Sequence, residues 1–156
     1  MNAEYRSLLT AVFLLLVGGS TSYAQQADTE QIQAALKTLH AAISALDVPK
    51  IESLWAHENY VMAKTPPDKS ISVGWDAVKK GWEANFSRIS ELNVTEADGP
   101  HIHVNGDVAW ALGIYPEVRK LKTGAAINDR VAETVVFEKQ GGKWLLVSLA
   151  ATRVPQ

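Results

Sequence analysis

The sequence predicts an α+β fold in which helices lie on one face of a curled antiparallel sheet. Three observations lead to this class. Apolar residues recur at helical spacing in the first half of the chain, and the second half consists of β-favouring runs separated by turn signals. The helical segments precede nearly all of the strand segments, an order typical of α+β domains. At 156 residues, the chain has the length of one domain.

The amino terminus predicts a signal peptide over residues 1–24. Arg6 precedes an apolar run from Leu8 to Val17, and Ser22 and Ala24 supply the small residues of a cleavage site. The apolar run covers about ten residues, well short of the roughly 20 that span a bilayer. We therefore expect cleavage after Ala24 and a periplasmic or secreted protein that has no membrane contact after cleavage.

Composition excludes several classes of function. The formal net charge is −2 and no basic block occurs, so nothing favours binding to nucleic acid. Cysteine is absent, which excludes disulfides and thiolate-bound metals. The sequence also lacks a glycine-rich phosphate loop, a nucleophile elbow and an HExxH motif. No cofactor and no metal are therefore expected.

Three helices are predicted before the main run of strands. The first begins at Asp28, whose carboxylate can cap a helix, and runs to about Ala45. Asp47 caps a second, shorter helix with Pro49 in its first turn. A third helix opens at residues 70–74. Its apolar stripe comprises Trp75, Val78, Trp82, Phe86 and Ile89.

Six extended segments follow from runs of β-branched, aromatic and alternating residues. The final two are joined by Gly141-Gly142 in a tight turn, and Asn105-Gly106 predicts a second hairpin. Pro116 should bulge or end its strand, or lie at an edge. The last segment is apolar on both faces, which places it in the middle of the sheet or against a second subunit. The predicted strands are 60–63, 92–95, 101–104, 107–120, 131–138 and 144–152.

Three short motifs follow one another along the chain: VGWDAV at residues 73–78, GDVAW at 106–110 and FEKQGGKW at 137–144. Their order and spacing resemble the SnoaL-like branch of the nuclear transport factor 2-like, ketosteroid-isomerase-like fold. The resemblance covers a SnoaL-like domain over residues 28–155. It implies a cone-shaped half barrel with three helices and an open cavity, and a homodimer formed through the exposed sheet face.

This sequence matches only part of the active site of the similar ketosteroid isomerases. Similar ketosteroid isomerases have a tyrosine on the first helix and an aspartate base on the first strand, where this chain has Leu39 and Ala63 or Lys64. The second acid of that site corresponds to Glu133. Many similar SnoaL-like proteins have histidines in the last strand, where residues 148–152 read SLAAT.

Glu133 is the candidate acid or base. It shares a strand face with Val131, Val135 and Phe137, and an apolar surrounding makes ionisation costly enough for proton exchange near neutral pH. The alternative is a carboxylate paired with Arg119, Arg130 or a lysine of a neighbouring strand. Asp129 lies on the same face, but we expect it in solvent near the start of the strand.

Aromatic residues are the candidate ligand contacts, because their rings can line a pocket for a small apolar or aromatic molecule. Residues in the middle of elements should face the interior of a cone, whereas Trp75 and Trp144 are expected in the core. The predicted ligand-binding residues are Tyr60, Trp82, Asn85, Trp110, Tyr115 and Glu133.

The histidines have simpler interpretations than a metal site. His101 and His103 share one strand face and would need a third ligand, such as His57, so exposure beside the hairpin turn is the expectation. His40 lies off the apolar stripe of the first helix and is also expected in solvent.

Three functions remain open from the sequence. The first is an exported SnoaL-like domain that binds a small apolar or aromatic molecule without catalysis. The second is a cofactor-independent isomerase, cyclase or dehydratase that uses Glu133 with Tyr60 or Asn85. The third is a dimeric association module without a ligand.

Overall fold

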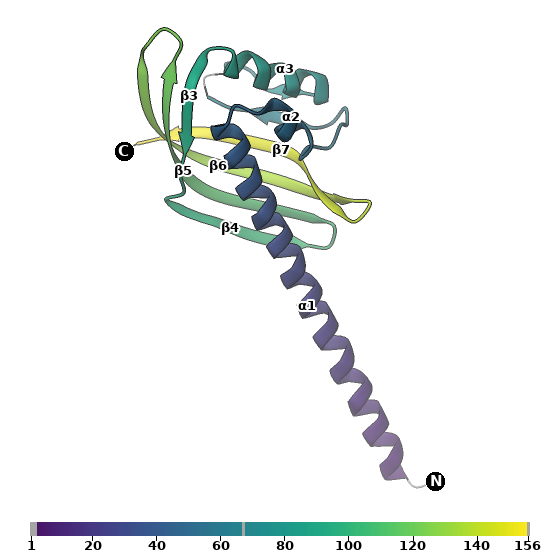
Figure 1. Ribbon diagram of the computed structural model, residues 1–156. Coiled ribbons are helices and arrows are strands. Elements are labelled where there is room, and N and C mark those ends of the chain that lie inside the picture. Colours follow the sequence, from purple (N-terminus) through teal and green to yellow (C-terminus); the bar gives the residue numbers. More distant parts are fainter. Residues whose placement is uncertain (1–2, 67, 156) are drawn as a thin grey trace.

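A computed structural model describes residues 3–66 and 68–155, and it confirms the α+β class. A curved sheet of seven strands carries three helices on one face (Figure 1). Its strand order is β2-β1-β7-β6-β5-β3, and β4 also pairs with β5. The helices are α1 (Ala3–Ser44), α2 (Val48–Glu52) and α3 (Trp75–Phe86). The strands are β1 (Met62–Lys64), β2 (Ser72–Val73), β3 (Ile89–Val94), β4 (Asp98–Asn105), β5 (Val108–Leu121), β6 (Ala126–Gln140) and β7 (Lys143–Val154).

The sheet is mixed rather than purely antiparallel. β1 pairs with β7 in parallel, with Ala63 opposite Leu149. A parallel pair needs a long connection between its strands, and here almost the whole domain lies between β1 and β7. The final strand is therefore internal, between β1 and β6, as its apolar sequence predicts.

A bulge in β7 changes which side chains share a face. Val136 pairs with Ser148 but the next residue, Phe137, pairs with Leu146, so one extra residue is inserted on β7. Trp144 and Leu146 are therefore buried on the same side as Leu149. Strict alternation along the strand would have placed them on opposite faces.

Pro116 lies inside β5 without ending or bulging it. β4 pairs with residues 108–114 of this strand, and β3 with residues 117–121. The carbonyl of Pro116 accepts a hydrogen bond from the Thr95 N–H in the connection between β3 and β4. Because N–H and C=O of a strand residue point to the same side, the missing N–H of the proline lies at this break in the ladder.

Helix α1 continues through the predicted start at Asp28, and its carboxyl-terminal half crosses the strands of the sheet (Figure 1). Asp28 instead links α1 to the last hairpin, where its carboxylate accepts hydrogen bonds from Lys139 Nζ at 2.6 Å and Trp144 Nε1 at 3.0 Å. These two hydrogen bonds lower the pKa of the Asp28 carboxyl, and the one from Lys139 has the larger effect. Within the described residues, no helix combines the length and apolarity needed to cross a membrane.

The two shorter helices differ in how well their starts were predicted: α2 begins as expected, and α3 begins later. Asp47 caps α2 through a 2.9 Å hydrogen bond from the Lys50 N–H. Helix α3 starts later than predicted, at Trp75, because Ser72 and Val73 pair with β1 as β2. Gly74, with φ of 82°, turns the chain between strand and helix in a conformation that favours glycine.

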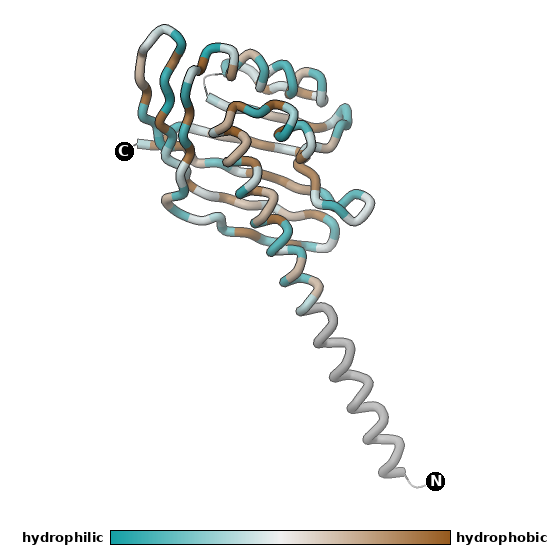
Figure 2. The backbone as a smooth tube through the Cα atoms, in the orientation of Figure 1, coloured by the Kyte–Doolittle hydropathy of each residue, from teal (hydrophilic) through white to brown (hydrophobic). Residues whose placement is uncertain are grey.

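The core lies between the helices and the inner face of the sheet. Apolar residues alternate along β6, occur on both sides of the bulge in β7 and lie on the part of α1 that crosses the strands (Figure 2). Phe137 is fully buried in the middle of this contact. The other fully buried large side chains are Ile32, Leu36, Leu39, Ile51, Val61, Val78, Val131, Val135, Leu146 and Leu149.

A buried histidine and glutamate form the candidate site

A His40–Glu133 pair lies between α1 and β6. His40 Nε2 is 2.9 Å from Glu133 Oε1, and the two side chains are only 14% and 9% exposed. The imidazole also packs against the ring of Tyr115, with 4.0 Å between ring centroids. Helix α1 and the consecutive strands β5 and β6 thus bring an imidazole, a phenol and an acid together.

His40 corrects the sequence analysis, which expected it in solvent. It follows Leu36 by four residues and precedes Ile43 by three, and helical spacing places it at the edge of the buried stripe. The face of α1 that meets the sheet is wide enough to include it. Glu133 pairs with this histidine. It is therefore neither an unpaired carboxyl in an apolar surrounding nor a partner of Arg119, Arg130 or a lysine, the two alternatives that the sequence left open.

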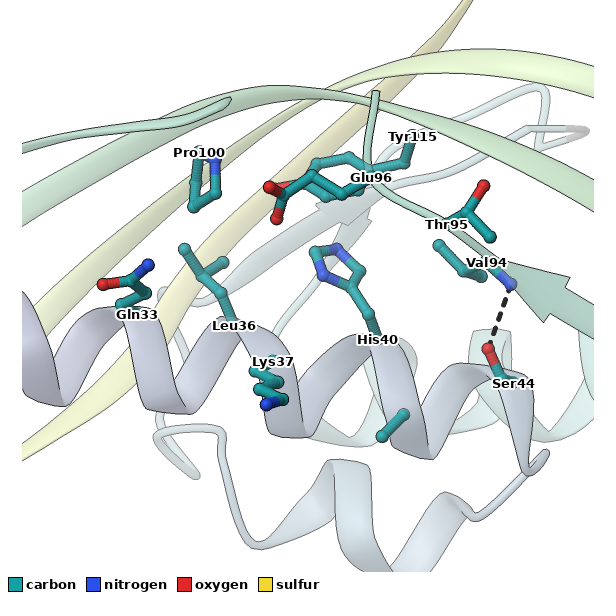
Figure 3. Close-up of a pocket in the computed structure, with 11 residues that line it drawn as sticks. Gln33, Leu36, Lys37, His40, Ser44, Val94, Thr95, Glu96, Pro100 and Tyr115 are labelled. Carbon is teal, nitrogen blue, oxygen red and sulfur yellow. Dashed lines mark hydrogen bonds between the residues drawn. The ribbon is translucent and has the colours of Figure 1, made fainter. Parts of the chain in front are cut away.

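The imidazole borders a groove of about 440 Å³ between α1 and the connection from β3 to β4 (Figure 3). Leu36, Val94, Pro100 and Tyr115 supply its apolar surface. Its polar groups come from Gln33, Lys37, His40, Ser44, Thr95 and Glu96. The groove can therefore hold a small molecule that has an apolar body and a few polar atoms.

Tyr115 is kept in its protonated form. Burial, assisted by the charges of Glu133 and Glu96, raises the pKa of its hydroxyl well above the ordinary tyrosine value. Among the described residues, no partner accepts a hydrogen bond from this hydroxyl. The Tyr115 ring occupies the space where Gly113 has no side chain: a Cβ at Gly113 would lie 2.7 Å from the hydroxyl oxygen. Tyr115 is thus a fixed neutral donor beside the groove.

On its other side, Glu133 faces a much smaller space next to α3. Trp82, Asn85 and Phe86 line this space with Glu117 and Arg119, and its volume is about 30 Å³. That volume holds one or two water molecules. The open space of the cone thus lies in the groove beside His40, not at its centre beside Glu133.

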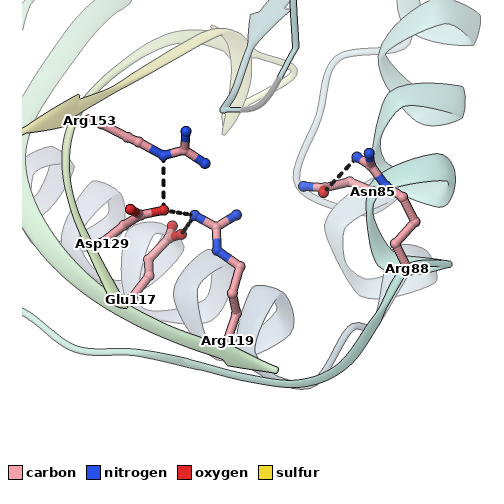
Figure 4. Close-up of polar contacts among 6 residues, drawn as sticks. All are labelled: Asn85, Arg88, Glu117, Arg119, Asp129 and Arg153. Carbon is pink, nitrogen blue, oxygen red and sulfur yellow. Dashed lines mark hydrogen bonds and ion pairs between the residues drawn. The ribbon is translucent and has the colours of Figure 1, made fainter. Parts of the chain in front are cut away.

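Charged residues of β5, β6 and β7 form an ion-pair network (Figure 4). Arg119 Nη2 pairs with the carboxylates of Asp129 and Glu117, the latter at 3.2 Å, and Arg153 Nε donates to Asp129 at 2.9 Å. Asp129, which we expected in solvent, has a side chain only 16% exposed. The two arginines explain how its charge is tolerated there.

Glu117 is the member of this network whose negative charge is disfavoured by its surroundings. Burial raises the pKa of its carboxyl, against the lowering effect of the Arg119 charge, and the negative charges of Glu133 and Asp129 raise it further. A carboxyl with a higher pKa in the folded than in the unfolded state destabilises the fold as pH rises through these two values.

Glu117→Gln should therefore raise the melting temperature at pH 7.5, and the gain should vanish below about pH 4, where the carboxyl is protonated in both states. Thermal unfolding at the two pH values measures this. Glu91→Gln, at an exposed ion pair with Lys120, is the matched control and should change little. A lower melting temperature for Glu117→Gln at pH 7.5 would show that the ion pair with Arg119 outweighs burial.

The predicted ligand contacts do not gather at one site. Trp82 and Asn85 border the small space at Glu133, and Tyr115 borders the groove. Tyr60 and Trp110 are 45% and 42% exposed and border neither. Tyr60 instead donates a 2.6 Å hydrogen bond to Glu138, so neither residue belongs to the site proposed below.

The remaining aromatic and histidine residues are structural or exposed. Trp144 is buried, whereas Trp75 is half-buried and stacks on His57 with 4.5 Å between centroids. His101 and His103 are exposed, as the simpler interpretation predicts. Among the described residues, no group of three or more histidines and carboxylates is placed to hold a metal ion.

Comparison with known proteins identifies the family. Residues 32–152 match the SnoaL-like domain family. No functionally curated protein matches the sequence.

Solved structures share the fold at low sequence identity. A nuclear transport factor 2-like superfamily protein from Salmonella enterica has a TM-score of 0.75 at 18% identity, covering 87% of this chain and 94% of that one. A ketosteroid isomerase-like protein from Erwinia carotovora scores 0.69 at 15%, covering 81% and 96%. A hexachlorocyclohexane dehydrochlorinase from Novosphingobium barchaimii scores 0.73 at 13%, covering 86% and 91%. The family match spans most of the chain, and the protein therefore belongs to the SnoaL-like domain family.

Proposed function

We propose that this SnoaL-like protein binds a small molecule in the groove and moves a proton to or from it through His40, in an isomerisation or elimination. One observation carries the proposal: the imidazole that borders the groove is held from behind by the buried carboxylate of Glu133. A base oriented by a second group is the usual arrangement for general acid–base catalysis.

The hydrogen-bonding groups assign the roles. An ionised carboxylate can only accept a hydrogen bond, so Nε2 of His40 donates to Glu133. In the neutral imidazole, Nδ1 then has the free lone pair and can take a proton from a bound molecule. None of the described residues hydrogen-bonds Nδ1. Glu133 acts through His40 and is a positioning residue.

Tyr115 supplies the complementary group. Its neutral hydroxyl can donate a hydrogen bond to a ligand oxygen that becomes negative as the proton leaves. Carbon acids activated by a carbonyl group fit this pair of a base and a donor. In an elimination from a β-hydroxyketone, His40 takes the α-proton and returns it to the hydroxyl group, which leaves as water when its bond to carbon breaks. The names of two structural neighbours, an isomerase-like protein and a dehydrochlorinase, agree with proton removal from carbon. The proposed step needs no cofactor.

The test is proton exchange at carbon. The protein is incubated in D₂O with a panel of small ketones and β-hydroxyketones, and proton NMR follows loss of the α-proton signal and formation of enone. Deuterium incorporation that depends on His40 supports the proposal. Exchange no faster than in buffer across the whole panel, with binding to the groove demonstrated, would contradict it.

Binding without catalysis is the second candidate, and the openness of the groove favours it. Lys37, Ala41 and Glu96 on its rim are exposed, so water is not excluded from the bound molecule in the way that many active sites require. The same experiment separates the two candidates, because a binding protein would shift ligand signals without exchanging their protons.

Export and dimerisation are further proposals. We propose cleavage after Ala24 and a periplasmic or secreted location, on the evidence of the amino-terminal sequence. The mass of the mature protein tests this, and a mass that does not match a chain beginning at Gln25 would contradict it.

We also propose a homodimer through the outer face of β5, where Val108, Trp110, Leu112 and Val118 are 42–54% exposed. Trp110→Glu would place a charge in that interface and should shift sedimentation at micromolar concentration from dimer to monomer. Ile71→Glu, at another exposed apolar residue, is the control and should leave the dimer intact. A wild-type monomer at that concentration would contradict the proposal.

A further inference from the structure

Three arginines from separate parts of the chain surround a cavity lined by the end of α3 and by strands β3, β5, β6 and β7. Arg88 follows α3, Arg119 lies on β5 and Arg153 on β7, and their guanidinium groups lie around the same gap in Figure 4. The cavity has a volume of about 130 Å³. Asn85, Ile89, Leu121 and Ile127 complete its lining. We refer to it as the arginine cavity.

Arg119 is the buried member of this set. The residue is only 5% exposed, and its Nη2 carries the bonds to Glu117 and Asp129. Its Nε has no hydrogen-bond partner among the described residues. A buried donor without a partner is rare in folded proteins, because its desolvation is not compensated. Arg119 also lines the cavity, so a ligand there would lie beside a buried guanidinium.

The other two arginines also have donors to spare. Arg153 uses Nε for Asp129, and Arg88 uses Nη2 for Asn85 Oδ1 at 3.3 Å. No other partner among the described residues is found for the two Nη groups of Arg153. Three guanidinium groups therefore face two carboxylates, those of Glu117 and Asp129. Glu133 pairs with His40 and with none of the three arginines, so the guanidinium groups and the two carboxylates that pair with them carry an excess of about one positive charge.

We propose that the arginine cavity binds the carboxylate of a small organic acid, with the apolar part of the acid against Ile89, Leu121 and Ile127. A planar guanidinium matches a carboxylate through paired hydrogen bonds. One negative charge balances the excess positive charge, whereas a doubly charged phosphate would meet the nearby Glu117 and Asp129. The site lies apart from the groove of His40, since the two share no lining residue.

Isothermal titration with benzoate tests the site, with benzamide as the neutral analogue and inorganic phosphate as the anion without an apolar part. The variant Arg88→Gln/Arg153→Gln removes the two more exposed arginines and keeps the buried Arg119. Arg130→Gln/Lys143→Gln removes the same number of charges where none borders the cavity, and serves as the matched control. All titrations are made at one ionic strength.

We expect benzoate to bind at least about 10-fold more tightly than benzamide or phosphate. Benzamide lacks the charge that strengthens hydrogen bonds to the arginines, and phosphate lacks the apolar contact. The Arg88/Arg153 variant should lose at least about 10-fold in benzoate affinity, and the control less than about 2-fold. Equal binding of benzoate and benzamide, tighter binding of phosphate, or unchanged affinity in the Arg88/Arg153 variant would each overturn the proposal.

His40→Phe separates this site from the proposed proton transfer. The variant should bind benzoate as wild type does, whatever its effect on exchange at carbon. Loss of benzoate affinity in His40→Phe would place the acid in the groove and overturn the arginine cavity as its site. Loss of proton exchange with unchanged benzoate binding supports both.

Discussion

His40→Phe should lower the rate of proton exchange at carbon by at least about 100-fold, the lower end of what a positioned acid or base contributes. Phenylalanine keeps a ring against Tyr115 but has no nitrogen to receive the proton. The rate is measured by proton NMR in D₂O with whichever ketone of the panel exchanges fastest. A variant that retains the wild-type rate would remove His40 from the reaction.

The same substitution leaves Glu133 buried without its partner, so lost stability must be distinguished from lost chemistry. An unpaired buried charge is costly, and His40→Phe should therefore melt at a lower temperature than wild type. Adding Glu133→Leu removes that charge and should recover part of the lost melting temperature. Proton exchange should stay absent in the double variant, which separates the chemical role of the pair from its structural one.

Glu133→Gln tests the positioning role alone. Glutamine has nearly the same shape, but its amide can donate as well as accept, and so it no longer fixes the Nε2–H form of His40. We expect a mixture of the two ring tautomers by nitrogen NMR and a slower exchange reaction. A single Nε2–H tautomer in Glu133→Gln would show that the carboxylate does not hold the ring.

Phe137→Ala should lower the free energy of unfolding by about 3–5 kcal/mol, the usual range for removing a buried phenylalanine. Phe137 is fully buried on β6, and Ala109 opposite it on β5 has no large side chain to fill the space. Both the lost apolar transfer and the remaining cavity contribute to the cost. Urea unfolding followed by tryptophan fluorescence measures it.

Ile71→Ala is the matched control for this experiment. Ile71 is 61% exposed, so the same kind of truncation should change the free energy of unfolding by at most about 0.5 kcal/mol. A comparably small change for Phe137→Ala would mean that the sheet and helices close around the missing ring.

Local sequence rules predicted most of the elements. The cap at Asp47, the two glycine hairpins and the last three strands follow from residues near each other in the chain. The errors arose where a distant partner decides: Ser72 and Val73 become a strand because β1 lies beside them, and Pro116 stays in β5 because β3 gives way to β4 there. One extra residue in β7 exchanged its faces, which alternation cannot anticipate.

The candidate site shows the same division. Glu133 was identifiable as an acid among Val131, Val135 and Phe137 on one strand face, and the structure buries it. Its partner His40 lies 93 positions earlier on a helix, where periodicity could show only that it stood at the edge of the stripe. The three arginines, similarly, are unremarkable in sequence and meet only through the curvature of the sheet.

The sequence by itself determined the α+β class, the SnoaL-like resemblance and the apolar strand face on which Glu133 lies, because these depend on periodicity, turn residues and the order of short motifs. The tertiary structure alone decided which side chains meet Glu133, where open space remains and which face of β7 is buried. Those properties depend on the strand register, the bulge and the packing of α1 across the sheet, and each is set by contacts between residues far apart in the chain.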